Sequence, residues 1–142
     1  MKNTILSFAL LLFGLSLAAQ SGQPTAQSLT DKMAEKYQLT DQQKTEMLTI
    51  QERLLRNLSE IEGLKKTDPT QHIEKMRALK MGTDSSIERL LTKDQLTIFR
   101  QEKAEFRKQK STLYSDLKAK GASQMQIDYK ISELEEASLT GH

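Results

Sequence analysis

The side chains that could do chemistry are few, and none falls in a catalytic arrangement. The chain has two histidines, His72 and His142, and no cysteine, which rules out disulfides and thiolate chemistry. His72 lies in the first turn of an expected helix. Its neighbours three and four positions on, Lys75 and Met76, do not complete a metal site. We therefore expect an exposed, structural His72 and no metal or other cofactor.

The carboxylates are also poorly placed for catalysis. Pairs such as Glu60 with Glu62 and Glu135 with Glu136 lie on expected helices, with no apolar pocket that would raise a carboxyl pKa. The chain has no G-x-S-x-G, no H-E-x-x-H, no P-loop and no glycine-rich dinucleotide turn. These absences predict that the protein is not an enzyme.

The N-terminal segment, residues 1–19, has the pattern of a signal peptide. Lys2 precedes an apolar run from Ile5 to Leu17, and small residues end at Ala19, before a plausible cut at Gln20. The run falls short of the roughly 20 apolar residues that span a bilayer. We therefore predict export to a periplasm, cleavage, and no stable membrane insertion afterwards. Residues 20–25 read as a linker, and residues 26–142 as a single helical domain.

Charge and composition limit the class of partner. The formal net charge of +2 falls to +1 (2 − 1) without residues 1–19, because Lys2 is their only charged residue. This argues against nucleic-acid binding, which usually needs a basic excess. The aromatic content of 5% is too low for a thick core, so we expect thin helices that each bury one stripe and are completed by a partner chain.

The apolar periodicity predicts an all-α fold. Helices are expected over residues 26–37, from Thr40 towards Gly63, from Pro69 through a loosened point near Gly82, and from Thr92 to about Lys120. A fifth helix is expected over residues 123–137. Residues 100–120 carry seven basic and three acidic side chains, a net +4, whereas residues 121–142 carry a net −3. Attraction across the turn at Gly121 favours folding back.

The same five-residue pattern, L-T-x-x-Q, opens two of these helices, at residues 39–43 and 91–95. A threonine at the N-cap and a glutamine three residues later form a capping box. Leu91 can also pack on Leu96 as a hydrophobic staple. The first copy has Lys44 at the corresponding position, so its staple is either missing or made by Met47. The motif residues, to which we assign a structural role, are Leu39, Thr40, Gln43, Leu91, Thr92 and Gln95.

Two such motifs in a small exported helical protein resemble the LTxxQ family of Spy/CpxP-like periplasmic proteins. The resemblance covers about residues 26–120. It implies a hooked helical hairpin of four helices that pairs antiparallel into a cradle-like homodimer. It also implies an ATP-independent chaperone of the envelope stress response, which holds partly unfolded envelope proteins. One alternative is a regulatory module that docks on an envelope sensor kinase, and a second is a metal-binding periplasmic stress protein.

The candidate partner surface lies on the helix of residues 92–120. Apolar residues recur there about every seven positions with lysines between them: Phe99, Lys103, Phe106, Lys110 and Leu113. Such a seam either belongs to the core or forms the surface that binds a client. For Phe106 we favour the core, because apolar stripes on helices are usually buried. The chain's methionines also allow two interpretations. The one we favour is that they fill irregular gaps between thin helical layers, and the other is that they form an adaptable binding surface.

Overall fold

The computed structural model describes residues 22–141, and all of its regular structure is helical. The expected signal peptide of residues 1–19 lies outside this range. The helices are α1 (Ala26–Tyr37), α2 (Asp41–Glu62), α3 (Leu64–Thr67), α4 (Pro69–Leu90), α5 (Lys93–Ala119) and α6 (Gln124–Thr140). The all-α prediction is therefore confirmed.

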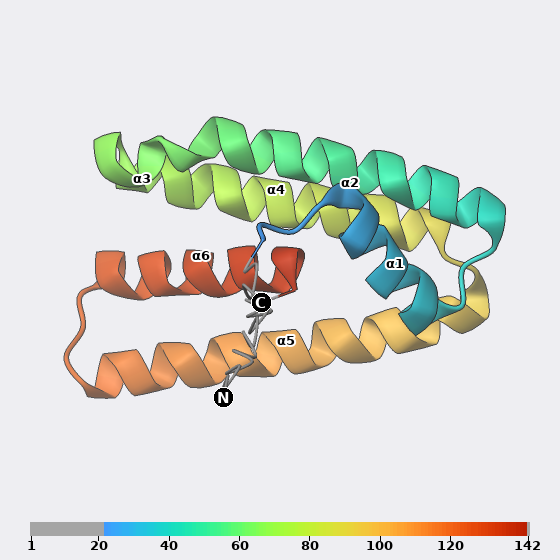
Figure 1. The fold of residues 1–142 in the computed structure, drawn as a ribbon. Coiled ribbons are helices and arrows are strands. Elements are labelled where there is room, and N and C mark those ends of the chain that lie inside the picture. Colours follow the sequence, from blue (N-terminus) through green and yellow to red (C-terminus); the bar gives the residue numbers. More distant parts are fainter. Residues whose placement is uncertain (1–21, 142) are drawn as a thin grey trace, which may run out of the picture.

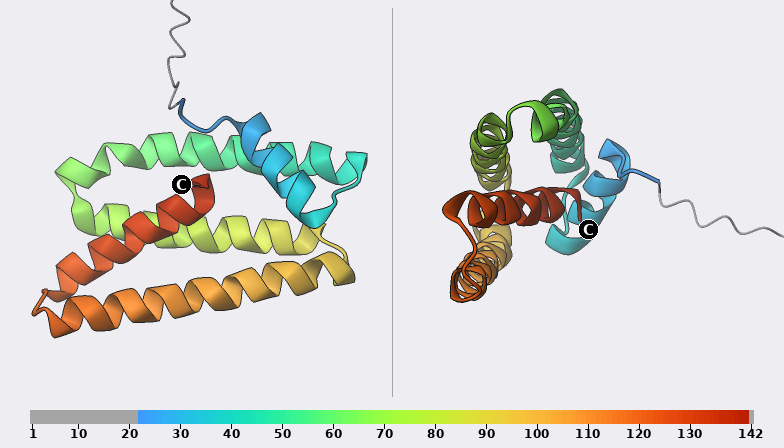
Figure 2. Two further views of the ribbon diagram at one scale, coloured as in Figure 1. Left: turned by 60° about the horizontal axis from the view of Figure 1, so that its bottom comes forward. Right: turned by 90° about the vertical axis from the view of Figure 1, so that its left-hand side faces the viewer.

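Two long antiparallel helices, α2 and α4, form one layer, and the turn of α3 joins them (Figure 1). The longest helix, α5, runs back beneath this layer. The last helix, α6, folds back and packs on both α4 and α5, while α1 lies against α2 near the opposite end (Figure 2).

The helix starts follow from local sequence. Thr40, Thr92 and Ser123 each cap a helix through a reciprocal box with the glutamine three residues later. Asp68 caps α4, with Pro69 at its first position. These starts are confirmed, as is the fifth long helix, which extends three residues beyond the expected end. Gly82 lies within the continuous helix α4, where an added Cβ would meet nothing within 4 Å.

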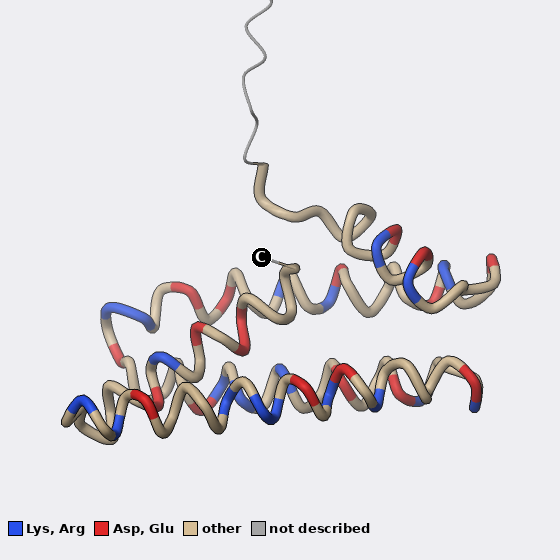
Figure 3. Tube along the Cα trace, turned by 90° about the horizontal axis from the view of Figure 1, so that it is seen from below, with Lys and Arg blue, Asp and Glu red and all other residues tan. Residues whose placement is uncertain are grey.

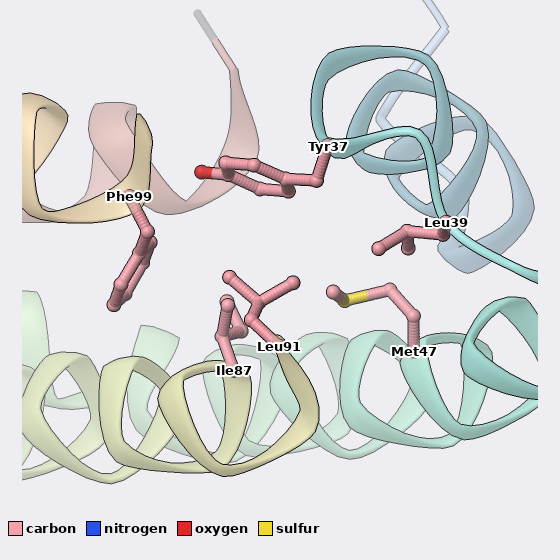
Figure 4. Packing of buried hydrophobic residues seen from close by; sticks show 6 residues of the cluster. All are labelled: Tyr37, Leu39, Met47, Ile87, Leu91 and Phe99. Carbon is pink, nitrogen blue, oxygen red and sulfur yellow. The ribbon is translucent and has the colours of Figure 1, made fainter. Parts of the chain in front are cut away.

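The apolar core is divided into two clusters. One gathers residues from α1, α2, α4 and α5 near the starts of α2 and α5, as Figure 4 shows: Tyr37, Leu39, Met47, Ile87, Leu91 and Phe99. Leu96 packs against this cluster, to which Leu91 belongs, and Met47 lies in the same cluster as Leu39. The second cluster, towards the α3 end, comprises Leu29, Leu54, Ile61, Met76 and Leu139.

One prediction about burial is wrong. His72 is not an exposed surface histidine, because only 1% of it is exposed, and neither ring nitrogen has a hydrogen-bond partner in the described part of the chain. The sequence places it in a first helical turn, which is commonly open to solvent. Its burial depends on how α2, α3 and α6 are placed around the start of α4, which local sequence does not reveal.

Candidate functional site: the face between α4 and α5

The two L-T-x-x-Q motifs lie side by side and hydrogen-bond to each other. The side-chain amide of Gln43 donates to the Gln95 carbonyl oxygen at 2.8 Å, and the amide of Gln95 donates to the Gln43 carbonyl oxygen at 3.1 Å. We call this pair the glutamine clasp. Leu39 and Leu91 are buried beside it. The clasp fixes the starts of α2 and α5 together, so its residues position the helices.

The candidate seam on α5 does not form one open surface. Phe99 belongs to the core, with 5% of its surface exposed, whereas Phe106 and Leu113 are half-buried. Lys103 lies over the Phe99 ring, 5.4 Å from its centroid. Lys110 lies 5.8 Å from the centroid of Phe106. Four of the five seam residues line hollows beside α5, and Leu113 lines neither of the two described next.

The first hollow is an inner cavity of about 290 Å³ between α1, α2, α4, α5 and the end of α6. Its wall includes Phe99, Phe106 and the buried side chain of Gln51. Its charged groups are mostly paired. Lys36 lies 2.7 Å from Glu102, and Lys80 lies 2.5 Å from Asp84.

Tyr37 closes one side of the inner cavity. Its hydroxyl donates to Glu102, and its ring meets Phe99 edge to face with centroids 6.2 Å apart. Burial raises the pKa of the Tyr37 hydroxyl, and the hydrogen bond to Glu102 raises it further. The phenol therefore stays protonated and acts as a hydrogen-bond donor that ties α1 to α5, without a poised acid or base.

The second hollow, of about 340 Å³, is a groove on the other side of Phe106, between α4 and α5. We call it the outer groove. Five basic residues line it against two acidic ones: Arg77, Lys80, Lys103, Arg107 and Lys110, with Asp84 and Glu135. Lysine and arginine recur along α5 in Figure 3. The groove is therefore net positive by three charges (5 − 2).

Two arginines of the outer groove are available to a partner. Arg77 on α4 and Arg107 on α5 are exposed, and neither has a carboxylate within 4.0 Å among the described residues. Between them lie the half-buried ring of Phe106 and Met81, which is 65% exposed. Guanidinium groups can bind carboxylates, and a flexible thioether beside an aromatic ring can pack on apolar side chains.

The candidate surface predicted from the sequence includes three α5 residues of this groove, Lys103, Phe106 and Lys110. It missed Arg107 of α5 and the whole α4 half. Arg77 and Met81 stand four positions apart on α4, on one helix face. An exposed methionine beside an arginine was the available signal. It was not decisive, because whether that face is covered depends on where α5 returns.

Neither a metal centre nor a membrane span is found in the described part of the chain. Nowhere within residues 22–141 do three histidine, aspartate or glutamate side chains gather so that they could hold a metal ion. No helix in that range is both long and apolar enough to cross a membrane.

Comparison with known proteins gives one match. A family model described as a domain of unknown function, DUF4890, matches residues 18–136. Neither the curated proteins nor the solved structures contain a match. The resemblance to Spy/CpxP-like proteins therefore stays a prediction, and the function has to be argued from the geometry.

Proposed function

The chain belongs to the DUF4890 family of unknown function, and we propose that it is an ATP-independent, chaperone-like protein that holds partly unfolded envelope proteins. The observation that carries this proposal is the outer groove. It offers Arg77 and Arg107, which pair with no carboxylate among residues 22–141, together with the exposed Met81 and the half-buried Phe106.

The proposed mechanism needs no nucleotide and no covalent step. The arginines attract acidic parts of a client and raise the rate of encounter. Met81 and Phe106 then cover apolar side chains of the client, and the flexible thioether can repack around different sequences. Because each contact is weak, the client is released readily, but a bound client is shielded from aggregation.

The test is suppression of aggregation by the purified chain, measured by light scattering with several unrelated unfolded proteins. Arg77→Glu combined with Arg107→Glu should abolish most of the suppression, and the loss should be greatest at low salt. The control, Arg56→Glu with Arg89→Glu, makes the same charge change at exposed positions that do not line the outer groove. The control should keep the activity.

Two results would contradict the proposal. If the wild-type chain slows the aggregation of none of the clients at a stoichiometric ratio, holding is not its function. If it ignores them but binds one folded envelope domain tightly, the regulatory alternative replaces the chaperone.

We also propose a periplasmic location and a homodimer. The location follows from the pattern of residues 1–19, and N-terminal sequencing should find Gln20 at or near the start of the envelope protein. The dimer would cover apolar surface that the thin layers leave open, such as Ile98, which is 40% exposed. Sedimentation at micromolar concentration should give twice the monomer mass. A monomer with full helicity would exclude the dimer.

A further inference from the structure

The last helix, α6, covers a face of α4 and α5 with an unusually polar contact. Of the five residues that α6 buries, three are polar or charged, namely Ser132, Glu135 and Thr140, and two are apolar, Ile127 and Leu139. Only Leu139 belongs to either apolar cluster. Loss of α6 from this face would therefore leave the cluster around Tyr37 and Phe99 intact.

Charge complementarity holds α6 in place. The carboxylate of Glu135, whose side chain is 4% exposed, lies 2.5 Å from the ammonium of Lys110 on α5. Glu136 lies 3.0 Å from Lys65 of α3, which also pairs with Glu62. Burial by itself would lower the pKa of Lys65, but its hydrogen bonds to both carboxylates raise it overall. An acidic helix is thus seated on basic residues of other elements.

The same region contains an unsatisfied polar group. His72 of α4 is buried, and neither ring nitrogen finds a hydrogen-bond partner among residues 22–141. The charges of Lys65, Glu136 and Glu62 act on it electrostatically. A buried polar group without partners costs stability in the closed arrangement. The buried region to which Glu136 of α6 is close therefore carries a cost in the closed arrangement.

The covered face and the outer groove are continuous. Lys110, which pairs with Glu135, also lines the outer groove, and so does Glu135 itself. The α5–α6 connection is short, and Gly121 turns within it at a φ of 77°. A helix that swings away about this turn would extend the basic groove along α4 and α5.

We infer that α6 can be displaced from the face of α4 and α5 that it covers. The partner that replaces it there is an acidic amphipathic helix. The inference rests on the proposed function and deepens it, because it names the chemistry of the segment held and adds the face beneath α6 to the holding surface of the outer groove. The partner helix would set carboxylates on Lys65 and Lys110, and small or apolar side chains against α4.

The first experiment measures the opening of α6 by hydrogen exchange on the full chain. Amides of α6 should exchange before those of α2 and α4. Glu135→Lys places a second cation against Lys110 and should raise exchange in α6 by about tenfold or more. The matched control is Glu133→Lys, on the same helix, where the exposed carboxylate pairs only with Lys130 of α6 itself. It should leave exchange in α6 within about twofold of wild type.

The second experiment uses a synthetic peptide with the sequence of residues 123–141 as the partner. The peptide should bind the Glu135→Lys chain more tightly than the wild-type chain, because the competent, open state is more populated. A peptide with Glu135→Lys and Glu136→Lys should not bind either chain. Bound peptide should also deprotect the chain's own α6.

Outcomes against this inference are separate from failure of the proposed function. Exchange in α6 as slow as in α2 and α4, unchanged by Glu135→Lys, would show a permanent core helix. Equal affinity of the peptide and its lysine variant would show that charge does not select the partner. Neither measurement uses an unfolded client, so a chain that fails to suppress aggregation leaves both results interpretable.

Discussion

Gln43 and Gln95 use all their side-chain hydrogen-bonding capacity in a reciprocal pattern. Each carbonyl oxygen accepts from the other glutamine and from its own N-cap amide, of Thr40 or Thr92. Gln43 also donates to the carbonyl oxygen of Leu90, and Gln95 to that of Gln38. Each bond of one motif has a counterpart 52 positions along the chain (95 − 43), so the two helix starts have a local two-fold relationship.

The substitution Gln43→Glu distinguishes the contribution of the glutamine clasp to stability from that of the helix cap. Glutamate at the third helical position completes a capping box as well as glutamine does, but it cannot donate to Gln95 or Leu90. We expect Gln43→Glu to lower the free energy of unfolding by about 1–3 kcal/mol, because two part-buried acceptors, on Gln95 and Leu90, lose their partner. Thermal or urea denaturation measures the change.

The third capping box supplies the control for this substitution. Gln126 pairs with Ser123 in the same way but makes no other side-chain hydrogen bond within the described residues. Gln126→Glu should be close to neutral. If both substitutions cost the same, the clasp contributes nothing beyond capping.

The threonine caps can be tested individually. Thr40→Ala and Thr92→Ala each remove an acceptor for an N-terminal amide, and each should cost about 0.5–2 kcal/mol. We expect the larger loss at Thr92, whose helix also depends on the staple between Leu91 and Leu96. Thr49→Ala, an exposed change within α2, is the control. Unchanged melting temperatures for both cap variants would refute the assignment.

The burial of His72 predicts a dependence of stability on pH. Burial lowers the pKa of His72 in the folded chain, and the nearby charge of Lys65 lowers it further, whereas the unfolded value is about 6.5. Below about pH 6.5 the unfolded chain therefore binds a proton that the folded chain does not, and stability falls with pH until the folded pKa is reached. Above that window His72 has no effect.

His72→Met removes this titration while keeping an apolar side chain of similar size. The variant should lose part of the decline in stability between pH 6.5 and 5, measured by urea denaturation. His142 is present in both chains, so the difference isolates His72. Parallel pH profiles for the two chains would show that His72 is protonated equally in both states.

The phenylalanines of α5 differ in what they stabilise. Phe99→Ala empties a buried aromatic site and should cost roughly 3–5 kcal/mol. Phe106→Ala should cost clearly less, because the ring lies between two hollows and is only half-buried. The Phe106→Ala variant also loses the contacts of the ring with the ammonium groups of Lys80 and Lys110.

The same two variants bear on function. Phe106→Ala should weaken the suppression of aggregation while the fold is retained, as checked by circular dichroism. Phe99→Ala should reduce suppression only in proportion to the unfolded fraction. If Phe106→Ala destabilises as strongly as Phe99→Ala, Phe106 is core, as its periodicity predicts.

The sequence predicts those features of the fold that depend on neighbours along the chain. The bounds of α1, the caps at Thr40 and Thr92, and the stop near Gly121 arise from contacts within a few residues. The glutamine clasp, the burial of His72 and the half-exposed state of Phe106 depend on which helix returns beside them. Periodicity identifies the face of a helix that is buried, but it does not identify the element that covers it.

The clasp also has a mechanical consequence. It holds α5 at one end only, and the helix of 27 residues is about 40 Å long. A rotation of about 5° about the clasp would move the far end by about 3.5 Å and leave the held end in place. While α6 contacts both α4 and α5, it opposes this rotation. When α6 is displaced, α5 can move away from α4, and the outer groove can widen to accept segments of different thickness.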